Sequence, residues 1–236
     1  MINRRSFITG IKSTKLNKQE INFLKKYKPW GIILFSRNLR SINQIKSLTK
    51  HVKKIFKDKH YPILIDQEGG RVNRLKKLIN LNSFTSEYFG KMFIKDKKKF
   101  NIIYKLYIDQ TCHLLSILGI NINTVPVLDL FYQGSSNIIG NRSFSNKSNI
   151  VSEIGDFCIK NFTKNSIGTV IKHIPGHGLA KVDSHNFTPK INKTLKYLLN
   201  KDFKSFKSKK SLFAMTGHIV FSEIDPINTV THSKKI

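Results

Sequence analysis

The sequence predicts an α/β protein, specifically a TIM (β/α)8 barrel that is incomplete, with about six of its eight βα units. Short apolar segments rich in β-branched residues alternate with longer, lysine-rich segments whose apolar residues recur at helical spacing. This alternation is typical of βα units around a parallel sheet. Polar or ionisable residues follow most of the apolar segments, as they do in barrels, whose active sites form at the C-terminal ends of the strands.

Six segments are predicted as strands because each is short, apolar and bounded by turn-forming residues. In chain order they are SFITGI (6–11), GIILFS (31–36), PILID (62–66), INTVPVLDL (122–130), GTVIKHI (168–174) and SLFAMTGHIV (211–220). A doubly wound open sheet, the alternative, usually carries a glycine-rich phosphate loop after its first strand. The residues at that point, ITGIKST, do not form such a loop, which favours the barrel.

Helices are predicted where apolar residues recur every three or four positions between these strands. They are NKQEINFLKKY (17–27), SINQIKSLTKHVKKIF (41–56), KKFNIIYKLYIDQTCHLLSILG (98–119) and IVSEIGDFCIKNFTKN (150–165). A closed barrel has eight units in typically about 250 residues, whereas this chain shows six strand–helix starts. No repeat or low-complexity linker divides the chain. We therefore expect residues 1–236 to form a single catalytic barrel domain that lacks its C-terminal part.

The charge is extreme, with a formal net charge of +28 at pH 7. Such a charge attracts nucleic acids and anionic membranes. However, only 7 of the 42 basic residues are arginine, and the lysines are spread over the whole chain together with many Asn, Ile and Phe residues. A nucleic-acid-binding face more often concentrates Arg and Lys on one element. This pattern favours compositional drift, so no nucleic-acid partner is expected, and a basic polyanion-binding protein stays an alternative.

Cysteine usage and hydropathy place the chain among intracellular proteins. Cys112 and Cys158 lie far apart in apolar, helix-like segments, which predicts buried free thiols. The N-terminus lacks the apolar core of a signal peptide, and no apolar run reaches the roughly 18 residues of a membrane span. We expect a cytoplasmic protein without a membrane span.

The first motif that can carry chemistry is LIDQEGGRVNRL, residues 64–75. A predicted strand delivers Asp66 and Glu68, two glycines allow a sharp turn, and Arg71 and Arg74 follow. Carboxylates and guanidinium groups at a strand end can bind several hydroxyl groups of a polar ligand. A turn with a surface ion pair is the simpler alternative. The related loop IGNRSFS (139–145), which contains Arg142, would by itself be an ordinary turn.

The second motif is KHIPGHGLAKVDSH, residues 172–185. His173 and His177 are four residues apart, a spacing that on a helix would allow both to bind one metal ion. Pro175 lies between them and prevents a helix there, so no metal site is expected. Asp183 and His185 are two residues apart, so the carboxylate can orient the imidazole for proton transfer. A solvated polar loop without catalytic function is the alternative.

Together, LIDQEGGRVNRL, PVLDL, NRSFS, KHIPGHGLAKVDSH and MTGHIVFSEIDP resemble, in order and approximate spacing, the motifs of glycoside hydrolase family 3. The sequence is most similar to the bacterial β-N-acetylglucosaminidases (β-hexosaminidases) of that family, over nearly the whole chain. The resemblance implies a cytoplasmic TIM-barrel glycosidase that removes terminal β-linked N-acetylglucosamine from muropeptides in peptidoglycan recycling. It implies neither a metal nor an organic cofactor, and its only implied ligand is this small-molecule substrate.

The resemblance also implies roles for individual residues. The substrate-binding residues would be Asp66, Arg74, Arg142, Lys172 and His173. His185 would be the general acid/base and Asp183 its dyad partner, whereas most retaining glycosidases use a carboxylic acid for this step.

One part of the family's pattern has no counterpart in the sequence. The family carries its nucleophilic aspartate in a sequence like SDDL on the strand after the MTGHIV segment, and Asp202 and Asp225 lie in different contexts. A retaining mechanism needs this nucleophile for its covalent intermediate. We therefore expect weak activity of these 236 residues alone, unless a separate C-terminal fragment completes the barrel. The first alternative is a sugar-binding or inactive remnant of the enzyme.

Overall fold

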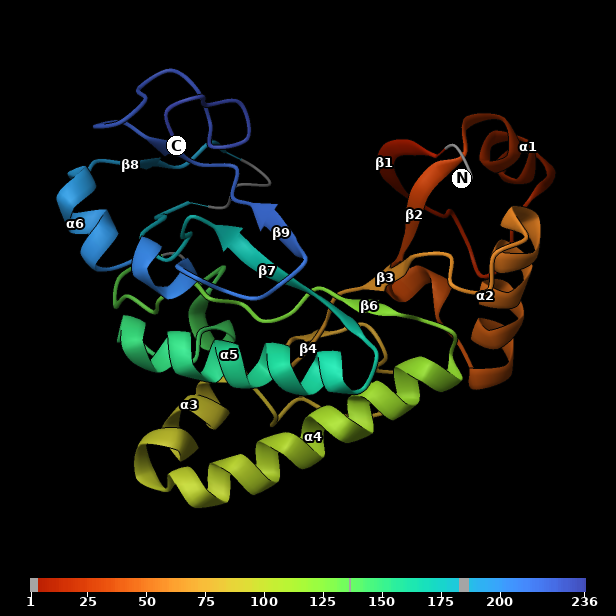
Figure 1. Ribbon diagram of the computed structural model, residues 1–236, viewed down its shortest axis with the longest axis horizontal. Coiled ribbons are helices and arrows are strands. Elements are labelled where there is room, and N and C mark those ends of the chain that lie inside the picture. Colours follow the sequence, from red (N-terminus) through yellow and green to blue (C-terminus); the bar gives the residue numbers. More distant parts are fainter. Residues whose placement is uncertain (1–3, 136, 183–186) are drawn as a thin grey trace.

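The computed structural model describes residues 4–135, 137–182 and 187–236. Its main sheet has six strands in the order β1-β2-β3-β6-β7-β9, and every neighbouring pair is parallel. The strands are Arg5–Gly10, Pro29–Leu34, Ile63–Ile65, Ile122–Asn123, Gly168–Ile174 and Phe213–Thr216. Each strand pairs with the next one along the chain, and the sheet curls with helices on its outer side (Figure 1). The predicted class, an incomplete (β/α) barrel, is confirmed.

Four helices occur where helical spacing predicts them: α1 (Lys18–Tyr27), α2 (Ile42–Phe56), α4 (Lys97–Ile117) and α5 (Ser148–Lys164). Two further helices, α3 (Ser86–Lys95) and α6 (Leu195–Asn200), were not predicted. The 3-10 turns are η1 (Ser36–Asn38), η2 (Gly140–Arg142) and η3 (Phe203–Phe206). A single residue, Asp96, separates α3 from α4. Helix α3 ends at Asp96, and the Asp96 side chain caps α4 by accepting a 2.9 Å hydrogen bond from the backbone N–H of Lys99.

Short strands add two small sheets. A hairpin follows β3, formed by β4 (Gln67–Gly69) and β5 (Val72–Asn73), and near the C-terminus β8 (Lys190–Ile191) pairs with β10 (Val220–Phe221). The predicted strand 122–130 contains only the two residues of β6 in the sheet. Pro126 lies just beyond β6 and has no N–H to donate, although an isolated bridge still joins Val127 to Lys172 of β7.

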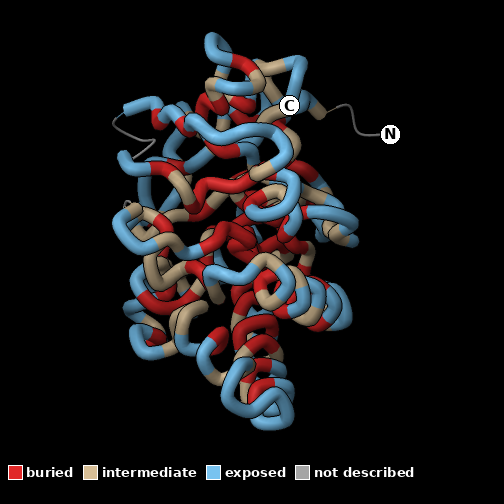
Figure 2. The backbone as a smooth tube through the Cα atoms, turned by 90° about the vertical axis from the view of Figure 1, so that its left-hand side faces the viewer, coloured by how far each residue is buried: buried red, intermediate tan, exposed pale blue. Residues whose placement is uncertain are grey.

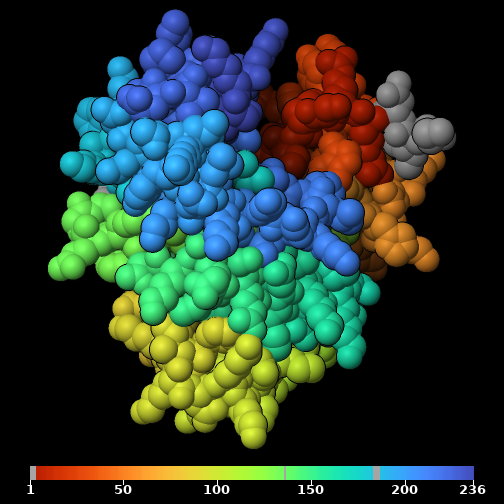
Figure 3. All heavy atoms as spheres, turned by 60° about the vertical axis from the view of Figure 1, so that its left-hand side comes forward, coloured from red at the N-terminus to blue at the C-terminus, as the bar shows by residue number. Residues whose placement is uncertain are grey.

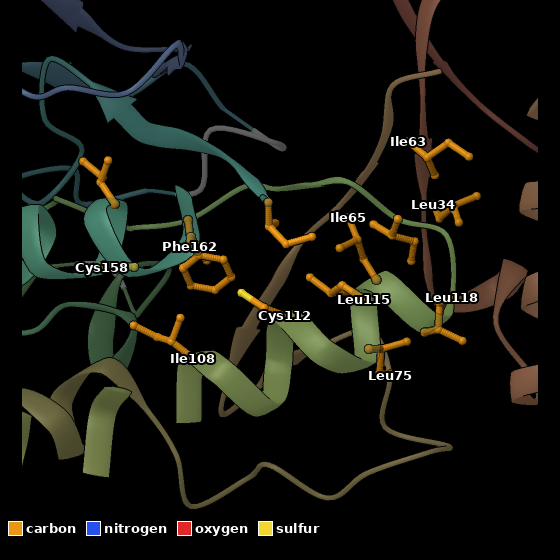
Figure 4. Close-up of a cluster of buried hydrophobic side chains, with 14 of the residues drawn as sticks. Leu34, Ile63, Ile65, Leu75, Ile108, Cys112, Leu115, Leu118, Cys158 and Phe162 are labelled. Carbon is orange, nitrogen blue, oxygen red and sulfur yellow. The ribbon is translucent and has the colours of Figure 1, made fainter. Parts of the chain in front are cut away.

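The strands separate two apolar layers because successive side chains point to opposite faces. Ile63 and Ile65 of β3 face the helices, where they join the largest core cluster. Leu64, between them, faces the barrel interior with Ile122 and Val170. Figure 4 shows the outer layer, in which side chains of α4 such as Cys112 and Leu115 point toward the strands.

Both cysteines are buried free thiols, as predicted. Cys112 lies in α4 and Cys158 in α5, and each is 1% exposed. Burial raises the pKa of each thiol to about 12, so both are packing residues rather than nucleophiles at neutral pH. Among the described residues, no helix combines the length and the apolar character that crossing a membrane requires.

The sheet is open between its edge strands β1 and β9. Buried residues concentrate in the middle of the molecule (Figure 2), but Ile8 of β1 is 45% exposed and Leu212, directly before β9, is 88% exposed. The N-terminal strands in red and the C-terminal segment in dark blue lie at the same end of the molecule (Figure 3). Unpaired edges with exposed apolar side chains are typical of a sheet that a further strand can extend.

Candidate active site

All five predicted binding residues meet at one cavity. Asp66, Arg74, Arg142, Lys172 and His173 line a cavity of about 400 Å³. They come from the segment after β3, the β4–β5 hairpin, the η2 turn and the end of β7. The C-terminal ends of neighbouring parallel strands lie at one edge of the sheet, so residues distant in the sequence are brought together there. The structure therefore brings these five residues together, and their role in substrate binding stays a prediction.

The centre of the cavity is an ion pair between Asp66 and Lys172. The Lys172 side chain is 2% exposed, and its Nζ lies 2.8 Å from Asp66 Oδ1 and 2.9 Å from Thr124 Oγ1. The Thr124 hydroxyl also donates a hydrogen bond to Asp66. Burial would raise the pKa of Asp66, but Lys172 and Thr124 outweigh burial and hold the pKa well below its usual range. Asp66 is thus a fixed carboxylate at neutral pH.

Glu68 is a second buried carboxylate, which the sequence-based set does not include. It lies 2.6 Å from Lys172 Nζ, and it accepts two hydrogen bonds of 2.8 Å from Arg142 Nε and Nη2. Burial opposes ionisation, yet these two cations lower the pKa of Glu68 to about 2. Glu68 also raises the pKa of Arg142 against the effect of burial. Arg142 is therefore held by a bidentate pair, the geometry that guanidinium and carboxylate groups favour.

A hairpin turn sets the positions of the two other arginines. Gly69 and Gly70 have φ angles of +96° and +53°, which side chains rarely adopt, so both glycines are needed between β4 and β5. Arg74 then lies with Nη2 3.4 Å from Asp66 Oδ2 and is about a third exposed. Arg71 instead donates to the carbonyl of Ile139 at 3.1 Å, which ties the hairpin to the loop that carries Arg142.

Asp129 orients His173. The Asp129 side chain is fully buried, and its Oδ2 lies 2.6 Å from His173 Nδ1. The backbone N–H groups of His173 and His177 also donate to Asp129, the second at 2.6 Å. Burial would raise the pKa of Asp129, but His173 and these hydrogen bonds lower it. An ionised carboxylate can only accept, so Nδ1 of His173 carries a proton and Nε2 is the nitrogen available to a ligand.

The segment after β7 is a tight loop and not a helix. β7 ends at Ile174, and turn residues follow at Pro175. The rings of His173 and His177 are 5.7 Å apart between centroids. Gly178 packs closely against the backbone of Leu130, because an added Cβ at Gly178 would lie 2.2 Å from the carbonyl oxygen of Leu130. The structure's described residues contain no group of three or more His, Cys, Asp or Glu side chains placed to hold a metal ion.

Asp183 and His185, the predicted proton-transfer pair, lie outside the described residues. Their roles therefore stay predictions. Asp202 and Asp225 are described, and neither lines the cavity. Asp225 accepts hydrogen bonds from the backbone of Ile227 and Asn228 at 3.2 and 3.1 Å, which stabilises its own loop.

Residues 5–236 match the family model of the glycosyl hydrolase family 3 N-terminal domain. The chain belongs to this family. It is 31% identical over 229 residues to a beta-hexosaminidase of Neisseria meningitidis and 29% identical over 224 residues to one of Hydrogenovibrio crunogenus. These alignments cover 95% and 93% of the chain but 62% of each relative, so this family 3 chain spans less than two thirds of their length.

A solved structure shows a similar arrangement. The family 3 chain aligns with the crystal structure of NagZ from Neisseria gonorrhoeae in complex with N-trifluoroacetyl-D-glucosamine, with a TM-score of 0.86 and 29% identity. The alignment covers 94% of this chain and 64% of that structure. The match confirms that the six strands form the barrel arrangement of family 3.

A further buried carboxyl group of the family 3 chain does not line the cavity. Asp202 is 1% exposed, and its Oδ2 accepts a 2.9 Å hydrogen bond from the Tyr132 hydroxyl. Among the described residues, no group donates to its Oδ1. Burial raises the pKa of Asp202 from 3.8 to about 6. Ionising Asp202 at neutral pH therefore opposes folding.

Replacing Asp202 with Asn should stabilise the protein at high pH. The folded-state pKa is raised, so stability falls as pH rises from about 4 to about 6 and stays reduced above that. Asp202→Asn removes this penalty and should raise the free energy of unfolding at pH 8 by about 2–3 kcal/mol. Near pH 4 the two proteins should be equally stable. Urea unfolding at both pH values, with exposed Glu223→Gln as control, measures the difference. An equal effect of Asp202→Asn at both pH values would contradict this prediction.

Proposed function

We propose that this chain is the sugar-binding part of a β-N-acetylhexosaminidase, a glycoside hydrolase that removes terminal β-linked N-acetylglucosamine from muropeptides. The observation that carries this proposal is the convergence of Asp66, Arg74, Arg142, Lys172 and His173 on one cavity. The similar NagZ from Neisseria gonorrhoeae was solved with a glucosamine derivative. We further propose that the reaction takes place in the cytoplasm, in peptidoglycan recycling, and that residues 1–236 belong to one barrel domain.

The chemistry of the cavity suits a neutral, hydroxyl-rich ligand. Fixed carboxylates accept hydrogen bonds from hydroxyl groups, and the cations donate to hydroxyl and carbonyl oxygens. The cations of the described lining are paired with carboxylates, because Lys172 and Arg142 contact Asp66 and Glu68, and the partly exposed Arg74 lies 3.4 Å from Asp66. A strongly anionic ligand would have to compete with these carboxylates for its cationic partners. These features support a sugar over a phosphate-bearing ligand.

The proposed reaction is a double displacement with retention. A carboxylate attacks the anomeric carbon while His185 donates a proton to the departing glycosidic oxygen, with Asp183 stabilising the imidazolium. His185 then takes a proton from water as the water oxygen attacks the anomeric carbon and releases the carboxylate. Of the described residues, Asp66 and Glu68 are the carboxylates that line the cavity, and both are paired with Lys172. We propose that the nucleophile comes from a polypeptide segment outside residues 1–236.

The open sheet supports a place for that segment. β1 and β9 are both edge strands, and Ile8 and Leu212 expose apolar side chains beside them. A separate C-terminal fragment that pairs with these edges would close the barrel and cover this surface. Since the carboxylates that line the cavity are already paired, sugar binding without hydrolysis is the second candidate function for the chain alone.

Activity measurements separate these functions. The chain alone should release nitrophenol from an aryl β-N-acetylglucosaminide very weakly, because both carboxylates that line the cavity among the described residues are paired with Lys172. Mixing it with the C-terminal third of the Neisseria meningitidis relative should raise this rate by at least 100-fold, and His185→Ala should remove the gain. Robust, His185-dependent activity of the chain alone would contradict the need for a further segment. No gain on mixing, with sugar binding intact, would favour the binding-only function.

A further inference from the structure

His218 forms a wall of the cavity that the predicted binding set leaves out. It follows β9, and it lines the cavity together with Met215, Thr216 and Gly217. The backbone N–H of Gly217 donates to the carbonyl of Ile174 at 2.7 Å. This bond extends the pairing of β7 and β9 past the ends of both strands. His218 therefore directly follows the paired part of β9, the strand next to β7, which carries His173.

The imidazole of His218 is held on one side. Its Nδ1 lies 3.2 Å from the hydroxyl of Thr231, and the same hydroxyl lies 3.1 Å from the hydroxyl of Thr216. The C-terminal loop therefore contacts the end of β9 and engages one of the two ring nitrogens. Within the described residues, Nε2 makes no hydrogen bond, and it is the nitrogen that remains for a ligand.

The lining of the cavity at His218 differs chemically from its lining at Asp66. At the Asp66 side, carboxylates and cations form fixed charged pairs. At the β9 side, the polar groups are the hydroxyl of Thr216 and the imidazole of His218, which can both donate and accept. These groups can therefore bind either a donor or an acceptor group of a ligand.

We propose that His218 is a further binding residue of this cavity, which contacts the bound sugar through Nε2. This inference rests on the proposed function, because it takes the ligand to be an amino sugar that binds beside Asp66 and Lys172.

Two conservative substitutions test which nitrogen matters. The amide nitrogen of Gln can occupy the position of Nε2, whereas the amide of Asn reaches only as far as Nδ1. We expect His218→Gln to keep the affinity for N-acetylglucosamine within about 3-fold, and His218→Asn to lower it by about 10-fold, the effect of one lost hydrogen bond. His232→Asn is the matched control, because its ring is 6.2 Å from that of His218 and does not line the cavity.

Titration with N-acetylglucosamine, followed by the imidazole signals in nitrogen-edited NMR, distinguishes the outcomes. A ligand-induced shift of His218 Nε2, with loss of affinity in His218→Asn alone, supports the proposal. Wild-type affinity in His218→Asn overturns it and leaves the proposed function standing, provided that Asp66→Asn still removes binding. Equal losses in His218→Asn and His232→Asn also overturn it, since they indicate a change in the C-terminal loop. No binding to the wild-type chain overturns both proposals.

Discussion

Replacing Lys172 with methionine should lower the free energy of unfolding at pH 7 by about 3–5 kcal/mol. Lys172 is almost fully buried and neutralises Asp66 and Glu68, at 2.8 and 2.6 Å. Methionine fills a similar volume but leaves two buried carboxylates without their shared cation. Arg142 still pairs with Glu68 at 2.8 Å, whereas Arg74 is 3.4 Å from Asp66. The variant should therefore also lose sugar binding, because Asp66 is no longer held as a carboxylate.

The pH dependence identifies the cause of this loss. In the wild-type chain Glu68 has a lowered pKa of about 2, so its contribution to stability is present above its unfolded value near 4.3 and lost as pH falls toward 2. In Lys172→Met burial dominates and raises the pKa of both carboxylates. Protonation of these carboxylates then removes the buried charges and reduces the loss of stability. The difference in free energy of unfolding between the wild-type chain and Lys172→Met, measured by urea unfolding, should be smaller at pH 4 than at pH 7. The exposed pair of Lys91 and Glu87 gives the control, Lys91→Met, with an expected loss below about 0.5 kcal/mol. A constant difference across this pH range would contradict the electrostatic explanation.

Two substitutions of Asp129 should distinguish its contribution to stability from its effect on His173 in the binding site. Asp129 accepts from His173 Nδ1 and from the N–H groups of His173 and His177. Asp129→Ala leaves these buried donors without an acceptor and should cost about 3–5 kcal/mol of stability, by the rule for a broken buried pair. Asp129→Asn keeps one acceptor oxygen for His177 but turns an N–H₂ group toward His173. His173 must then carry its proton on Nε2, the nitrogen that faces the ligand.

The tautomer of His173 is measurable. Nitrogen-15 NMR of the imidazole should show Nδ1–H in the wild-type chain and Nε2–H in Asp129→Asn. Sugar affinity should fall by at least 10-fold in Asp129→Asn, with a smaller loss of stability than in Asp129→Ala. Asp156→Asn, a surface carboxylate that pairs with Lys209, serves as control and should leave the affinity unchanged. Full affinity in Asp129→Asn, with the tautomer inverted, would contradict the proposed orientation of His173.

Much of the fold follows from apolar periodicity in the sequence. All six strands of the main sheet overlap predicted segments, although β1 and β2 begin one and two residues earlier than predicted, because buried parallel strands must be short apolar runs. Strand length was less predictable: β6 contains only two residues of the predicted segment 122–130. Helix α3 was not predicted, and a single residue separates it from α4: Asp96, whose backbone is extended and whose side chain caps α4.

The sequence predicted most residues of the site, but not which of these residues contact one another. Asp66 and Lys172 are 106 residues apart, and nothing in their local sequence shows that they form a pair. Glu68 could have been added from the sequence, because it lies two residues after Asp66 and so shares its face in extended chain. Asp129 gave a weaker signal, a single carboxylate after a strand. Its partners His173 and His177, 44 and 48 residues away, become visible only in the fold.

The cavity around Asp66 and Lys172 should bind N-acetylglucosamine. Isothermal titration calorimetry of the wild-type chain with this sugar tests it most directly, with Asp66→Asn as the paired variant. Asn keeps the size of the side chain but removes the charge that Lys172 holds in place. We expect saturable binding of one sugar per chain, weakened at least 100-fold in Asp66→Asn. The absence of saturable binding, or equal affinity in the two proteins, would contradict it.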